Sequence, residues 1–116
     1  MTDPVSALEA HVEAFNDRDL AALMAGFTDD AAWITGTTTV RGSAELADLF
    51  EGALRGLLPT LTLDNVIASG DQAAAQLTET LTADGAEHTF AIAGFYRFRD
   101  GRISAAKIYR EGSAEI

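Results

Sequence analysis

The apolar residues of this chain change their spacing at Pro59. Before this proline they recur every three or four residues, as on helices, and after it they alternate with polar residues, as on strands. The alternating half divides into four segments, at residues 60–69, 72–83, 87–99 and 102–111. The connections carry dipeptides typical of tight hairpins: Gly70-Asp71, Asp84-Gly85 and Asp100-Gly101. The sequence therefore predicts four antiparallel strands in its second half.

The first half of the chain supplies helices that can cover such a sheet. Asp3 followed by Pro4 is typical of a helix start. The first helix has an apolar stripe with His11 beside it: Val5, Leu8, Val12 and Phe15. Residues 19–27 predict a second, short helix that Asp17 or Asp19 caps. Residues 31–35 predict a strand, and residues 36–42 a loop or a short hairpin arm.

Ser43 predicts the start of a third helix, and Leu58-Pro59 its end. Its apolar face consists of Leu46, Leu49, Phe50, Ala53, Leu54 and Leu57. Helices gathered on one side of an antiparallel sheet form an α+β layer structure. We therefore expect one α+β domain over residues 1–116. Its curved antiparallel sheet wraps around the N-terminal helix as a cone, with the helices on the concave side.

Composition excludes several classes of function. The net charge of −10 argues against nucleic acids and anionic membranes as partners, because both require clustered Lys and Arg. Cysteine is absent, which excludes disulfides and thiol catalysis, and the two histidines lack metal-ligand spacing. We expect neither a metal nor a cofactor. The N-terminus lacks the pattern of a signal peptide and no apolar run reaches the ~20 residues of a membrane span, so we expect a cytoplasmic protein.

Alternation assigns side chains to the two faces of the expected sheet. If Leu77 and Leu81 face the interior, Glu79 between them does too, unless it lies near the strand end and reaches water. The next strand has large residues on one face and smaller ones on the other. The large ones are Phe90, Ile92, Tyr96 and Phe98, with Gly94 among them, and the other face carries Ala91, Ala93, Phe95 and Arg97. Alternation alone does not decide which face of the last strand points inward.

Three stretches together resemble the nuclear transport factor 2-like superfamily: "DLAALMAGFTDDAAWIT", "GSAEL" and "FYRFRDGRISAAKIY". Within it, the pattern is similar to ketosteroid isomerases and SnoaL-type polyketide cyclases. The resemblance implies a cavity inside the cone, but it places Thr35 where the isomerases keep their aspartate base. It places His11 and Gly94 at the two oxyanion donors, and Ile108 at an aspartate found in cyclases and epoxide hydrolases. Since a threonine hydroxyl cannot act as a base near neutral pH, standard steroid isomerisation is disfavoured.

The same resemblance implies a set of residues around the cavity. The candidate ligand-binding residues are Trp33, Thr35, Phe50, Leu77, Leu81, Ile92, Ile108 and Arg110. Glu79, His11 and Tyr96 are the candidate catalytic residues, with Glu79 as acid or base and the others as orienting or oxyanion groups. Alternative interpretations make Trp33 a core residue, His11 a boundary residue and Arg110 a solvated one. We expect Glu79 and His11 to contact each other, directly or through one water, because a lone buried carboxylate is costly.

Two functions follow from this interpretation. One is proton-transfer chemistry, such as isomerisation, cyclisation or dehydration, on a small hydrophobic carbonyl or hydroxyl compound. The other is a non-catalytic ligand-binding or dimerisation module. In either case we expect a homodimer through the outer sheet face around Ala91, Ala93 and Phe95, with Tyr109 as a neighbour.

Overall fold

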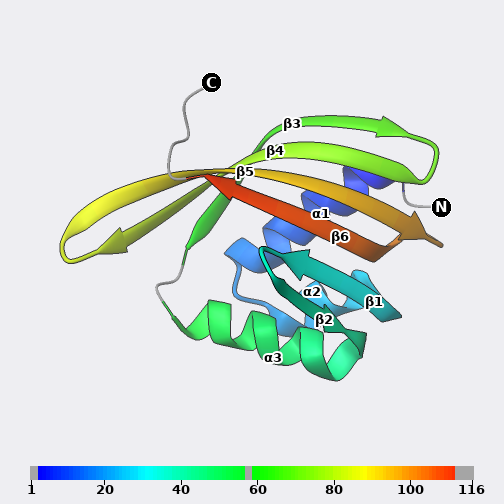
Figure 1. Cartoon of the computed structure of the whole chain (residues 1–116), viewed down its shortest axis with the longest axis horizontal. Helices are drawn as coiled ribbons and strands as arrows, with labels where there is room; N and C mark the ends of the chain where they lie inside the picture. Colours follow the sequence, from blue (N-terminus) through cyan, green and yellow to red (C-terminus); the bar gives the residue numbers. More distant parts are fainter. Residues whose placement is uncertain (1–2, 57–58, 112–116) are drawn as a thin grey trace.

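Six strands form one curved, unclosed sheet that three helices cover in the computed structural model, which describes residues 3–56 and 59–111 (Figure 1). The helices are α1 (Pro4–Asn16), α2 (Leu20–Ala25) and α3 (Gly42–Arg55). The strands are β1 (Phe27–Thr35), β2 (Thr38–Arg41), β3 (Thr60–Ser69), β4 (Gln72–Ala83), β5 (Ala86–Arg99) and β6 (Arg102–Glu111). Their order in the sheet is β2-β1-β6-β5-β4-β3. The predicted α+β class and the four consecutive antiparallel strands are confirmed.

The sheet is mixed rather than purely antiparallel, because β1 and β6 run parallel. Trp33 lies opposite Ala106 in this pairing, and Thr35 lies opposite Ile108. Turn dipeptides predict only the pairing of consecutive strands. The β1–β6 pair joins distant parts of the chain, so no local pattern indicated its direction.

The starts of the helices agree only in part with the sequence analysis. The Asp3 carboxylate caps α1 by accepting a hydrogen bond from the Ser6 backbone N–H at 2.8 Å, and Asp19 rather than Asp17 caps α2. Ser43 does not cap α3, which begins at Gly42 with Arg41 at the N-cap position. There the Glu45 carboxylate accepts a hydrogen bond from the Arg41 backbone N–H at 3.2 Å. Glu45, from the first turn of α3, thus satisfies the backbone just before the helix.

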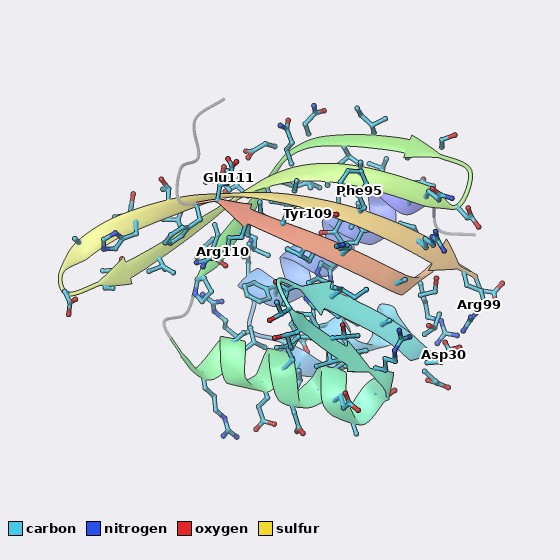
Figure 2. All side chains as sticks on the ribbon, viewed as in Figure 1. Asp30, Phe95, Arg99, Tyr109, Arg110 and Glu111 are labelled. Carbon is cyan, nitrogen blue, oxygen red and sulfur yellow. The ribbon has the colours of Figure 1, made fainter. Side chains whose placement is uncertain are left out.

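The first strand is longer than predicted. It begins at Phe27, which the sequence analysis assigned to the second helix, and it includes two exposed aspartates. One of them, Asp30, accepts a hydrogen bond from the Arg99 guanidinium at 2.5 Å, near the far end of β5 (Figure 2). The predicted hairpin arm after this strand is the short strand β2.

Helices α1 and α3 enclose the inner face of the sheet from different sides. Helix α1 packs against β3 and β4, and α3 packs against β1. The core between them consists mainly of buried apolar side chains, among them Leu8, Phe15, Leu23, Phe27, Leu46 and Ile103. At the end of α1, the Asn16 amide donates to the Leu61 carbonyl and accepts from the Leu61 N–H, both at 2.8 Å. This pair of hydrogen bonds joins β3 to the end of the helix. Leu57, predicted on the apolar face of α3, lies outside the described residues.

Candidate active site

A cavity of about 240 Å³ opens between the helices and the inner face of the sheet. Its floor comes from alternate residues of β4, β5 and β6, and its walls come from α1, α3 and β1. The lining side chains are His11, Phe15, Trp33, Thr35, Leu49, Phe50, Ala53, Pro59, Leu61, Leu77, Glu79, Ile92, Tyr96, Ile108 and Arg110. Most of them are apolar, and a few polar groups converge on the same space, which is the usual composition of a small-molecule site.

His11 lies deep in the site, among aromatic rings. Its ring centroid is 5.6 Å from that of Phe27, 5.7 Å from that of Trp33 and 6.2 Å from that of Phe50. The side chain is 6% exposed, and burial lowers the pKa of His11 from 6.5 to about 4. His11 is therefore neutral at physiological pH, and its Nδ1 has no hydrogen-bond partner among the described residues.

Glu79 and Arg110 form an ion pair at the edge of the cavity. The guanidinium of Arg110 donates to Glu79 Oε1 at 2.6 Å and lies 4.0 Å from the ring centroid of Phe90. The Glu79 side chain is 15% exposed and that of Arg110 is 48% exposed. The three residues come from three adjacent strands and point to the same side of the sheet. The carboxylate on the apolar face thus has a cationic partner.

The predicted direct contact between Glu79 and His11 is wrong. No ion pair joins them in the described part of the chain, and desolvation is the cause of the lowered pKa of His11. The expected cost of a lone carboxylate is offset instead by Arg110, which also carries a permanent charge that His11 lacks. Arg110 is thus paired at the cavity edge, and not only solvated.

Tyr96 brings a hydroxyl to the floor of the cavity. The residue is 3% exposed and its ring centroid lies 6.4 Å from that of Trp33. Burial raises the pKa of the Tyr96 phenol, so the hydroxyl keeps its proton at all physiological pH values. It makes no hydrogen bond to any of the residues that the structure describes. Trp33 packs on the core and also lines the cavity.

Most of the predicted site residues meet at the cavity. All three catalytic candidates line it, as do the predicted ligand-binding residues other than Leu81. Leu81 lies opposite His88 in the part of the β4–β5 hairpin that projects beyond the rest of the sheet (Figure 1), so it does not reach the cavity. Whether the lining residues bind a ligand stays a prediction.

Several lining residues were not predicted. They are Phe15, Leu49, Ala53, Pro59 and Leu61. Leu49 and Ala53 share the apolar face of α3 with Phe50, and Phe15 follows His11 by one helical turn, so their helical spacing was a usable signal. Pro59 comes just before β3, and Leu61 lies in β3 opposite Glu79 of β4. Alternation alone did not indicate that this end of β3 reaches the cavity.

The outer face of the sheet has a broader hollow of about 620 Å³. Its walls include Ile67, Phe95 and Lys107, and the first two are 70% and 57% exposed. Figure 2 shows Phe95 beside Tyr109 of the neighbouring strand, with their ring centroids 5.9 Å apart. Because exposed side chains form its walls, this hollow is a surface depression, and it coincides with the face on which we expect the dimer.

Among residues 3–56 and 59–111, no group of three or more His, Cys, Asp or Glu residues could hold a metal ion. Within the same residues, no helix has both the length and the apolar character needed to cross a membrane.

Comparison with known proteins identifies relatives of the fold. The family model of the SnoaL-like domain matches residues 8–106. An NTF2-like protein of unknown function from Burkholderia pseudomallei is 23% identical, with a TM-score of 0.84 over 97% of this chain and 93% of that one. An LEH-like epoxide hydrolase from M. tuberculosis is 23% identical, with a TM-score of 0.77 over 90% and 80% of the two chains.

A third solved structure contains a small ligand. It is a protein from Catenulispora acidiphila with a ketosteroid isomerase-like fold, in complex with trimethylamine. It is 16% identical to this chain and has a TM-score of 0.83 over 98% of this chain and 90% of that one. No curated protein matches the sequence. At these identities the solved structures establish the fold.

Proposed function

Since the chain belongs to the SnoaL-like domain family, we propose that its cavity binds a compact, uncharged, largely apolar molecule with one carbonyl or hydroxyl group. The observation that carries the proposal is the convergence of neutral polar groups in an apolar cavity. His11 and Tyr96 are both uncharged at neutral pH, and the charges of Glu79 and Arg110 compensate each other. A ligand with a net charge would lose its hydration without a free counter-charge among the described lining residues.

The volume of the cavity limits the size of the ligand. A cavity of about 240 Å³ exceeds the roughly 150 Å³ that suffices for benzene. It is smaller than the ~300–1,000 Å³ that is usual for drug-sized ligands. One or two fused rings therefore fit the space better than a tetracyclic skeleton.

Binding is testable through the only tryptophan, because Trp33 lines the cavity. We expect 2-indanone, a two-ring ketone, to shift the Trp33 indole N–H and the amides of β5 and β6 in NMR spectra. Ala53→Phe should abolish these shifts by filling the cavity, whereas Ala44→Phe, at an exposed site of the same helix, should not. The proposal is overturned if the shifts persist in Ala53→Phe. It is also overturned if neither 2-indanone nor indane, the hydrocarbon of the same shape, shifts any resonance of the wild type.

One observation supports a second candidate, proton-transfer catalysis. The Glu79 carboxylate and the Tyr96 hydroxyl line the same cavity. In a bound ketone, Glu79 would take a proton from the carbon next to the carbonyl, and Tyr96 would donate a hydrogen bond to the developing enolate oxygen. Glu79 would then return a proton to carbon; in D₂O its carboxyl proton first exchanges with solvent, so a deuteron is returned. The epoxide hydrolase-like neighbour is consistent with enzymatic use of this fold.

Deuterium exchange separates the enzyme from the non-catalytic module. If Glu79 acts as a base, the protein accelerates the exchange of the α-protons of 2-indanone in D₂O, and Glu79→Gln abolishes the acceleration while binding persists. Binding without accelerated exchange would identify a non-catalytic ligand-binding module.

A further inference from the structure

Gly94 stands out among the described glycines because a side chain there would have no room. Its φ is not in the left-handed region, unlike those of Gly36, Gly42 and Gly70. Instead, the space around it is full. A Cβ built on Gly94 would lie 2.5 Å from Cζ and Cε2 of Tyr96 and closer still to its hydroxyl oxygen. Real Cβ atoms do not approach other atoms so closely, so Tyr96 occupies the volume that a side chain at position 94 would fill.

The neighbouring strands make room for this arrangement. Tyr96 lies opposite Ala73 on β4 and Ala106 on β6, and both are small and buried. Gly94 lies opposite Ile108, which lines the cavity. The phenol ring lies back along its own strand, over Gly94. This orientation keeps the hydroxyl on the inner side of the sheet, next to the cavity.

We propose that Tyr96 is the hydrogen-bond donor that recognises a carbonyl or other uncharged acceptor in the ligand, and that Gly94 is its positioning residue. This inference rests on the proposed binding function. The hydroxyl is protonated and has no partner among the described residues, so it can donate to a ligand. Any side chain at position 94 would displace the ring and take the donor away from the cavity.

The binding test compares 2-indanone with indane, which has the same shape but no acceptor. We expect wild type to prefer the ketone by about 2- to 10-fold, as one neutral hydrogen bond provides. Tyr96→Phe and Gly94→Ala should each reduce this ratio to near one, and the carbonyl ¹³C resonance of bound 2-indanone should move upfield in both. Gly52→Ala is the matched control, because nothing lies within 4 Å of its added methyl group. It should leave the ratio unchanged.

A stability measurement tests the positioning role even if Gly94→Ala folds poorly. Gly94→Ala should lower the urea midpoint of unfolding strongly when Tyr96 is present. The same substitution should lower it little in a Tyr96→Leu background, which lacks the ring. Equal losses in both backgrounds would overturn the role of Gly94. A wild-type protein that binds indane and 2-indanone equally in the cavity would overturn the role of Tyr96, and the proposed binding function would stand. If neither compound binds, the proposed function itself fails.

Discussion

Replacement of His11 by phenylalanine should stabilise the protein and remove part of its sensitivity to acid. His11 is buried among three aromatic rings, and its Nδ1 has no hydrogen-bond partner among the described residues. Phenylalanine keeps the ring contacts and removes the unsatisfied nitrogen. A buried polar atom without a partner costs about 1–3 kcal/mol. We therefore expect His11→Phe to raise the free energy of unfolding by an amount of that order at neutral pH.

The dependence on pH follows from the pKa of His11. This pKa falls from 6.5 in the unfolded chain to about 4 in the folded protein. Above about pH 6.5 both states are neutral at this residue and it has no effect. As the pH falls below that value, the unfolded state binds a proton at this residue and the folded state does not. The free energy of unfolding therefore decreases until about pH 4. At about 1.4 kcal/mol per pH unit, the whole effect is about 3 kcal/mol, of which about 2 is lost by pH 5.

Urea unfolding followed by circular dichroism, at about pH 7.5 and about pH 5, measures the effect. The fall in the free energy of unfolding over this range should be about 2 kcal/mol larger in wild type than in His11→Phe. His88→Gln is the matched control, because it removes the exposed histidine and leaves His11 in place. Equal falls in wild type and His11→Phe would refute the assignment of His11 as a buried, neutral histidine.

Three further predictions concern other parts of the molecule. Asn16→Ala should lower the free energy of unfolding by about 1–3 kcal/mol in urea titrations, because it leaves the N–H and C=O of Leu61 without their partner. Wild type should be a dimer at concentrations of about tens of micromolar in analytical ultracentrifugation. Ala93→Arg should be a monomer, since it adds charge beside Tyr109 on the outer face; a monomeric wild type would contradict the proposed interface. Finally, we expect no substantial isomerisation of a 3-keto-Δ5-steroid in an absorbance assay, because Thr35 cannot act as the base and Gly94 cannot donate a side-chain hydrogen bond. Turnover at ~1–1,000 per second would contradict this.

The sequence predicted the inner face of the sheet where one face was clearly more apolar than the other. On β4 and β5, alternation correctly placed Leu77, Ile92 and Tyr96 inward, and Glu79 with them. On β6, both faces mix apolar and charged residues, so alternation could not choose between them. The structure points Ile108 and Arg110 to the cavity, as the family resemblance implied.

The partner of Glu79 could not be predicted from patterns of this kind. Alternation specifies the face on which a side chain lies, but not which residue of another strand comes within hydrogen-bond distance. Glu79 and Arg110 belong to strands that are not adjacent, and Arg110 reaches the carboxylate past Phe90 on the strand between them. That contact depends on the registers of two strand pairs at once. The sequence analysis paired Glu79 with His11 because both were titratable groups expected in the cavity. In the structure, His11 lies among aromatic rings instead.

The missing side chain of Gly94 can be interpreted in two ways. By resemblance, a glycine at this position removes the carboxyl donor that the isomerases keep there. In the structure the same glycine leaves room for the phenol of Tyr96, two residues further along the strand. Glycine inside a strand often marks a close approach of another group, so the pair of Gly94 and Tyr96 was a signal in the sequence. In this chain, a side chain at position 94 and the ring of Tyr96 cannot occupy the same space. A search for function in relatives of this chain should therefore consider both positions together.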